Sequence, residues 1–216
     1  MIPRGLPRGY SFPEAVASVV SCQHMDGVLD LLQKARTRPP ARIVTDWLPR
    51  LELHGGVALD LGCGSGAEAE YLAKNGFMVD AIDKSETAIK YTKERCQGLT
   101  VDAVQGDFRE FQLRPDYYAI AIAINSLPFV QKEACRTLLM AVQASLKPGG
   151  AVLLGVFGPE HAWAGRADMS FWTLDEFKSL WDGWNILALN EFKAPWPLVS
   201  GEEIFQHRIH LVARKI

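Results

Sequence analysis

The sequence predicts an α/β protein built on a doubly wound, largely parallel sheet. From Val57 onward, short apolar runs alternate with amphipathic segments of helical spacing, which is the pattern of repeated strand–helix–strand units. The last two apolar runs are separated by a loop too short for a crossover helix, so they must pair as an antiparallel hairpin. A chain of 216 residues, 48% of them hydrophobic, is large enough to bury one such core.

The N-terminal part of the chain has a different pattern. Residues 1–10 hold Pro, Gly and Arg with little that could be buried, so we expect a loosely docked arm. Three helical patterns follow at about residues 13–21, 26–36 and 41–51. We therefore expect an N-terminal arm and helical cap over residues 1–52, and a main domain over residues 53–216.

The main domain should contain five parallel strands and the helices that connect them. The expected strands are residues 57–61, 77–82, 100–105, 117–124 and 151–157. The expected helices are residues 67–75, 85–96 and 131–146, with Ser85 as an N-cap. We expect a turn, Lys147-Pro148-Gly149-Gly150, before the fifth strand, because Pro ends a helix and Gly accepts positive φ.

The carboxyl-terminal part is expected to complete the sheet. Thr173 and Glu176 have the spacing of a capping box, which predicts the start of a further helix. Two strands follow at about residues 184–192 and 204–214, with a loop at residues 194–201. The predicted fold is therefore a sheet of seven strands, five parallel and two in an antiparallel hairpin, preceded by a helical extension.

Charge and cysteine usage exclude several function classes. Lys and Arg number 23 and Asp and Glu 25, so the chain lacks the basic excess that neutralises nucleic-acid phosphates. The four cysteines form no Cys-x-x-Cys pair and no His stands at metal-ligand spacing, so we expect no metal. No apolar run is as long as a signal sequence core or a membrane span. We expect a cytoplasmic protein with neither nucleic acid nor membrane as partner.

The segment Leu59-Asp60-Leu61-Gly62-Cys63-Gly64-Ser65-Gly66 is the strongest functional signal. Here a strand leads into a turn with glycine at alternate positions, and glycine lets the backbone approach a ligand closely. The unpaired N–H groups at the N-terminus of the next helix can bind an anion, and the Asp60 carboxylate can accept a hydrogen bond from a cationic amine. Because Gly62-x-Gly64-x-x-Ala67 also fits the dinucleotide fingerprint, an NAD(P)-dependent oxidoreductase is an alternative.

Two later segments add to this turn, Val79-Asp80-Ala81-Ile82-Asp83 and Val104-Gln105-Gly106-Asp107-Phe108. With them the chain resembles the class I S-adenosylmethionine-dependent methyltransferases over roughly residues 41–215. The runs 58–84, 146–150 and 207–215 are most similar to the small-molecule, tellurite-resistance-type branch. The resemblance implies a Rossmann-like sheet of order 3-2-1-4-5-7-6, with S-adenosyl-L-methionine as cofactor and S-adenosyl-L-homocysteine as product. It also implies a small-molecule methyl acceptor.

The resemblance implies a set of cofactor contacts, namely Asp60, Gly62, Cys63, Gly64, Asp83, Lys84, Asp107, Phe108 and Asn125. The glycines would line the methionine part, with Asp60 near its amine. Asp83 would accept from both ribose hydroxyls, which needs two carboxylate oxygens. Asp107 would accept from the adenine amino group, while the Phe108 N–H and the Lys84 stem would contact the ring. Each acid could instead be only a helix cap or a turn residue.

The acceptor is expected beyond the carboxyl ends of the strands. Asn125, after the fourth strand, stands where the family brings a group near the sulfonium, although it could simply cap its loop. Trp163, Trp172 and Trp196 are expected in loops, where they could form an aromatic lid or only fill gaps against the core.

The catalytic residue stays open. His161 is the candidate general base, and it could equally be a solvated loop histidine. A base is needed only for an acceptor that must lose a proton. An RNA or protein methyltransferase, and a binding protein without catalysis, are further alternatives to a small-molecule enzyme.

Overall fold

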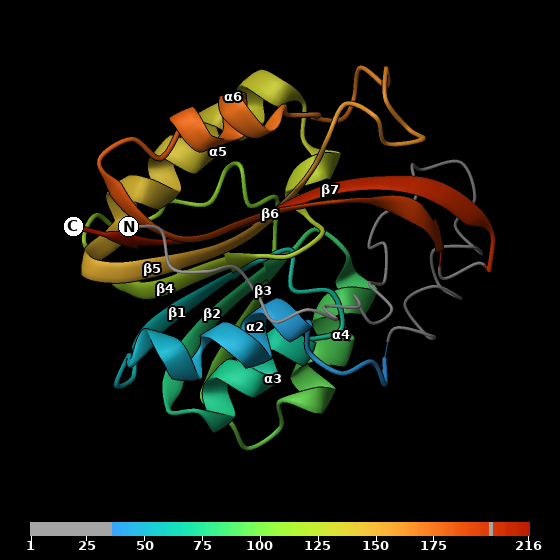
Figure 1. The fold of residues 1–216 in the computed structure, drawn as a ribbon. Helices are drawn as coiled ribbons and strands as arrows, with labels where there is room; N and C mark the ends of the chain where they lie inside the picture. Colours follow the sequence, from blue (N-terminus) through green and yellow to red (C-terminus); the bar gives the residue numbers. More distant parts are fainter. Residues whose placement is uncertain (1–35, 199–200) are drawn as a thin grey trace.

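A seven-stranded sheet lies between two layers of helices in the computed structural model, which describes residues 36–198 and 201–216 (Figure 1). The strand order is β3-β2-β1-β4-β5-β7-β6, as the sequence predicts. The strands from β3 to β5 pair in parallel, and β7 pairs antiparallel with β5 and β6. The predicted Rossmann-like fold with a terminal hairpin is therefore confirmed. The helices expected at 13–21 and 26–36 lie outside the described residues, apart from Arg36.

The observed elements follow the predicted pattern closely. The strands are β1 Gly56–Leu61, β2 Phe77–Asp83, β3 Val101–Gln105, β4 Tyr118–Ala123, β5 Leu146–Phe157, β6 Trp184–Pro197 and β7 Glu203–Lys215. The helices are α2 Arg42–Trp47, α3 Ala67–Lys74, α4 Glu86–Arg95, α5 Lys132–Ser145 and α6 Leu174–Ser179, with 3₁₀ turns at Pro49–Leu51 and Leu127–Phe129. No helix in these described ranges has the length and apolar character needed to cross a bilayer.

Each face of the sheet has its own apolar core. Helices α5 and α6 cover one face, over Trp172, Phe177 and Trp181 (Figure 1). Helices α2, α3 and α4 cover the other, where Val44 and Leu72 are buried against the strands. Because both faces are covered, β1 and β4 read as nearly continuous apolar runs. Because these strands are parallel, the polar residues that follow them are brought together at one edge of the sheet.

Strand β5 begins earlier than the sequence predicts. Leu146 pairs with Tyr118, and the next pair along the two strands is Ala151 with Ile120. The expected turn at 147–150 is thus a bulge inside β5 and not a separate connection, which corrects the prediction. The physical reason is that Leu146 is fully buried and joins the sheet as soon as α5 ends.

The β6–β7 hairpin is longer than predicted. Strand β6 runs to Pro197, and Trp196 pairs with Ile204, so residues 194–197 of the loop expected at 194–201 are strand. Proline is tolerated there because β6 is an edge strand. The β5–β7 pairing ends at Phe157 and Arg208, and the hairpin extends past the sheet beyond them (Figure 1).

The capping box predicted at Thr173 is present, with both reciprocal bonds to Glu176. We expect Thr173→Ala to lower the free energy of unfolding by about 1 kcal/mol, because the Glu176 N–H loses its acceptor. Urea denaturation measures the loss. Thr137→Ala is the control, since Thr137 is exposed inside α5 and Ala is the better helix former. Equal losses for the two variants would contradict a capping role.

Candidate functional site

A cavity lies where the carboxyl ends of β1 to β4 meet. Its lining residues are Gly62, Asp83, Lys84, Asp107, Phe108, Arg109, Ser126, Phe129 and Val130. The space between these residues, part of it open to solvent, is about 460 Å³. Of the contacts predicted from sequence, Gly62, Asp83, Lys84, Asp107 and Phe108 line this cavity directly. Asp60, Cys63, Gly64 and Asn125 belong to segments adjoining its walls.

The turn between β1 and α3 consists largely of left-handed backbone. Gly62, Gly64 and Gly66 have φ values of 77°, 55° and 77°, where residues with a Cβ are disfavoured. A Cβ on Gly62 would lie 2.3 Å from the Cβ of Ser126, so no side chain fits at this position. The turn therefore brings bare backbone against the end of β4 and into the cavity wall.

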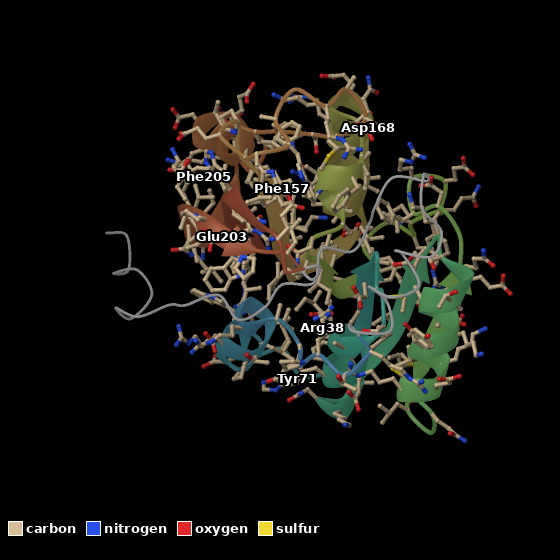
Figure 2. The ribbon with its side chains drawn as sticks, turned by 90° about the vertical axis from the view of Figure 1, so that its right-hand side faces the viewer. Arg38, Tyr71, Phe157, Asp168, Glu203 and Phe205 are labelled. Atoms are coloured by element: carbon tan, nitrogen blue, oxygen red, sulfur yellow. The ribbon has the colours of Figure 1, made fainter. Side chains whose placement is uncertain are left out.

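Asp60 and Cys63 are buried behind this turn. Asp60 is 2% exposed, and its Oδ2 accepts no hydrogen bond from the described part of the chain. Burial and the nearby Glu68 raise the pKa of Asp60 well above its usual value. Glu68 itself accepts from both terminal nitrogens of Arg38, a residue labelled in Figure 2. Burial likewise raises the pKa of the Cys63 thiol, which opposes a role as a thiolate nucleophile.

Asp83 and Asp107 lie at the ends of neighbouring strands. The Asp83 carboxylate accepts from the Gly64 N–H at 3.0 Å and from the Ser85 N–H at 2.9 Å. Burial raises the pKa of Asp83 despite these two donors. Asp107 accepts from Arg109 Nε at 2.8 Å, and hydrogen bonding from Arg109 holds the pKa of Asp107 below its usual range. Both acids line the cavity, with Asp83 also bracing the glycine turn.

Asn125 follows β4 with a left-handed backbone, at φ 61°, a region that Asn tolerates better than most residues. It is 9% exposed, and its Oδ1 accepts from Arg208 Nη1 at 2.9 Å. The next residue, Ser126, donates through Oγ to the Leu61 carbonyl at 2.5 Å. This bond ties the end of β4 to the end of β1 beside the cavity.

His161 is buried, which corrects the expectation of a solvated loop residue. It is 2% exposed and stacks on Phe157 with ring centroids 3.9 Å apart. Its Nδ1 accepts from the Trp163 N–H at 3.1 Å, so Nε2 carries the proton and donates to Gln206 Oε1 at 3.0 Å. Burial lowers the pKa of His161 to about 4. Both ring nitrogens are therefore engaged, and the side chain positions Gln206.

The structure does not bring the three candidate tryptophans together. Trp172 is fully buried in the core beneath α5 and α6. Trp196 lies in β6 and not in a loop, with its ring 6.0 Å from that of Phe192. Trp163 is partly exposed, and its ring lies 6.2 Å from that of Phe129, which lines the cavity. Of the three, Trp163 is the one that adjoins the site.

Sequence reasoning missed part of the cavity wall, namely Arg109, Ser126, Phe129 and Val130. The signal that could have found them is position, because Arg109 lies two residues after Asp107 and the other three lie within five residues after Asn125. Arg208 was also missed, since its contact with Asn125 joins residues far apart in sequence. Across the described ranges, no three His, Cys, Asp or Glu side chains are grouped as metal ligands.

The sequence profile of a family described as "Methyltransferase domain" matches residues 58–150. This stretch begins in β1, includes the glycine turn and all the residues that line the cavity, and ends in the β5 bulge. The chain carries a class I S-adenosylmethionine-dependent methyltransferase domain. S-adenosylmethionine is the cofactor of this methyltransferase domain.

Two curated relatives show how far the similarity extends. The cypemycin N-terminal methyltransferase of Streptomyces sp is 32% identical over 108 residues, covering 50% of this chain and 44% of that protein. The ubiquinone biosynthesis O-methyltransferase of Marinobacter nauticus is 32% identical over 106 residues, covering 47% of this chain and 44% of the relative. The chain thus spans less than half the length of these relatives.

Solved methyltransferase structures share the fold at lower identity. TehB from Haemophilus influenzae superposes with a TM-score of 0.68 and 20% identity, covering 80% of this chain and 61% of that one. Magnesium protoporphyrin IX methyltransferase from Synechocystis PCC 6803, solved with bound S-adenosylmethionine, gives a TM-score of 0.61 and 16% identity, over 88% and 82% of the two chains. The seven-stranded sheet is therefore the sheet of this class.

We expect Gly62→Ala to lower the free energy of unfolding by about 3 kcal/mol, because it adds left-handed strain to a clash with Ser126. Chemical denaturation measures the change. Gly165→Ala is the matched control, since its φ is 93° and an added Cβ meets no described atom within 4 Å. It should cost only about 1 kcal/mol. If Gly62→Ala lowers the free energy of unfolding by no more than Gly165→Ala does, Ser126 does not restrict the turn.

The pKa of His161 predicts a pH-dependent stability. Its folded pKa of about 4 lies below the unfolded value of 6.5, so its contribution is complete above pH 6.5 and is lost as the pH falls toward 4. Between pH 7 and pH 5 the free energy of unfolding of the wild type should therefore fall by about 2 kcal/mol more than that of His161→Gln. Urea denaturation at the two pH values measures the difference. An equal loss in both proteins would mean that His161 is protonated in the fold.

Proposed function

We propose that this protein is a methyltransferase that transfers the methyl group of S-adenosylmethionine to a small-molecule acceptor. The observation that carries the proposal is the cavity between the glycine turn and the acids Asp83 and Asp107. We assign the methyltransferase domain to residues 53–216, with residues 1–52 as an arm and cap. Cys63, Cys96 and Cys135 are buried free thiols, which fits the reducing cytoplasm that we propose as its location.

The methionine end of the cofactor would lie at the glycine turn. The buried Oδ2 of Asp60 needs a donor, and the cofactor amine would supply one. Gly62, Cys63 and Gly64 would present backbone to the methionine, because a side chain at Gly62 would collide with the end of β4. Asn125 would flank the sulfur from that same end of β4.

The nucleoside end would lie between β2 and β3. Asp83 has the two oxygens that the ribose hydroxyls require, and it lines the cavity. Asp107 would accept from the adenine amino group, with the Phe108 N–H as a donor to the ring. The aliphatic stem of Lys84, which also lines the cavity, would cover the ring face.

The bound cofactor would supply a methyl group, activated by a positively charged sulfur, to the acceptor atom, with the carbon–sulfur bond broken and a neutral thioether left as product. The contribution of this chain is alignment, because an in-line displacement gains rate from holding the two reactants in position. An acceptor that is readily ionised, such as a thiol, needs no base from the protein. His161, bonded through both nitrogens, has a positioning role in this proposal.

A small-molecule acceptor is supported by the net charge of −2, which gives no overall attraction to RNA. The name of one relative, a ubiquinone biosynthesis O-methyltransferase, is that of an enzyme of small-molecule metabolism. A screen in which thiols, phenols and amines are each tested as methyl acceptors would identify the type of atom that is methylated.

Binding of S-adenosylhomocysteine tests the proposed cofactor site. Asp83→Asn should weaken it by about tenfold or more, because ribose hydroxyls lose hydrogen bonds to a charged group. Isothermal titration calorimetry measures the affinity. Asp80→Asn is the matched control, as Asp80 lies on the same strand but bonds to Tyr118 away from the cavity lining. Absence of binding to the wild type at millimolar ligand, or binding of NADH instead, would overturn the proposal.

A further inference from the structure

A buried arginine lies beside the proposed methyl-transfer site. Arg208 is on β7, where its backbone pairs with Phe157 of β5, and it is 5% exposed. Its Nε donates to Gln206 Oε1 and its Nη1 to Asn125 Oδ1, both at 2.9 Å. The guanidinium also lies over the ring of Phe157, 5.6 Å from the centroid. All three of these partners are neutral.

This guanidinium has no counter-charge within the described residues. None of the ion pairs formed there includes Arg208, and burial alone lowers its pKa to about 10. Its titratable neighbours, His161 and His210, are themselves held neutral by burial. Arg38, a partly buried arginine, differs in pairing with the buried Glu68. Because an uncompensated buried charge is costly, the position calls for an anionic ligand.

The topology separates Arg208 from the nucleoside half of the site. Strands are spaced by about 4.8 Å, so β7 lies about 14 Å from β1, with β4 and β5 between them. Asp83 and Asp107, on β2 and after β3, lie on the opposite side of β1. Arg208 therefore lies on the side of the cavity toward which the methyl group would leave.

Two contacts connect Arg208 to the cavity wall. Its side chain reaches back across β5 to Asn125, whose neighbour Ser126 lines the cavity. Phe157, labelled near the centre of Figure 2, lies 6.0 Å from the ring of the lining residue Phe129. The guanidinium thus lies directly beside residues that adjoin the cavity wall, and Arg208 is not fully enclosed, since 5% of it remains exposed.

The guanidinium group of Arg208 is held in position by neutral hydrogen-bond acceptors. Gln206 Oε1 accepts from both Arg208 and His161, so the histidine fixes the amide that orients the guanidinium. Nη2 of Arg208 donates to none of the residues that the structure describes. A planar guanidinium with a donor edge left over is suited to a carboxylate, which it can bind through two parallel hydrogen bonds.

We propose that Arg208 binds an anionic oxygen group, such as a carboxylate, on the methyl acceptor. This assignment rests on the proposed function, because it takes the cofactor to lie in the cavity described above. The acceptor class is then a small organic acid whose nucleophilic atom lies a short distance from its carboxylate. Asn125 and Gln206 position the guanidinium, and His161 holds Gln206.

Matched acid and amide probes test this assignment. We would titrate the protein, with and without S-adenosylhomocysteine, with acetate and acetamide, 3-mercaptopropionate and 3-mercaptopropionamide, and benzoate and benzamide. We expect at least one acid to bind about tenfold more tightly than its amide, because only the acid pairs with the guanidinium. Calorimetry measures each affinity, and the ligand-free titrations read the preference independently of the cofactor.

Variants of Arg208 test whether the preference for an acid over its amide depends on this residue. Arg208→Met should abolish it, while Arg208→Lys, which keeps the charge but not the fork, should retain part of it. Arg166→Met is the control, because Arg166 is exposed and pairs with Asp168. The melting temperature reports whether each variant is folded. If Arg208→Met does not fold, the acid and amide affinities of the wild type and of Arg208→Lys still test the assignment.

Three results would overturn the assignment. The first is a wild type that binds no acid better than its amide, and the second is a preference that survives in Arg208→Met. The third is a loss of S-adenosylhomocysteine affinity in Arg208→Met with unchanged affinity for 5′-methylthioadenosine, which would assign the arginine to the carboxylate of the cofactor. Failure of the wild type to bind S-adenosylhomocysteine would instead refute the proposed function, while the ligand-free titrations still test Arg208.

Discussion

The left-handed turn at Gly62–Gly66 is the constraint on which the site depends. It is held from three sides: Asp83 of β2 accepts from the Gly64 N–H, Thr92 of α4 donates to the Gly64 carbonyl at 2.9 Å, and Ser126 after β4 donates to the Leu61 carbonyl. An added Cβ would collide with Ser126 at Gly62 and crowd Thr92 at Gly66, so these two positions need glycine for space as well as for their positive φ. The turn therefore sets the separation of β1 from its two neighbours at the carboxyl edge, and with it the width of the cavity.

The charges around the cavity are distributed unevenly. Acids stand at the nucleoside half, where Asp83 and Asp107 end neighbouring strands, and the buried Asp60 lies behind the glycine turn. On the opposite side, at Arg208, stands a buried guanidinium that pairs with no carboxylate of residues 36–198 or 201–216. This asymmetry matches a cationic sulfonium donor with hydroxyl groups on one side and an anionic acceptor on the other. A single cleft can thus orient both reactants by electrostatics before any chemistry occurs.

The sequence predicted the sheet because its strands are buried on both faces, so apolar runs and their glycine and proline boundaries are clear. The resemblance to class I methyltransferases pointed to Asp83 and Asp107, and both line the cavity because the ends of parallel strands share one edge of the sheet. The sequence could not predict where side chains of the segment before Thr173 point. Trp172, which could form a lid or fill a gap against the core, is a core residue, and His161, which could be a base or a solvated loop residue, is buried. Arg208 was beyond reach for a different reason, because its burial and its contact with Asn125 depend on tertiary packing alone.

A crystal structure of the protein with S-adenosylhomocysteine tests the central claim most directly. The account predicts the ribose hydroxyls on Asp83, the adenine beside Asp107 and Phe108, and the thioether sulfur facing the end of β4, on the side of Arg208. Ligand bound elsewhere, or bound in this cavity with the adenine at β4 and the sulfur at β3, would contradict it.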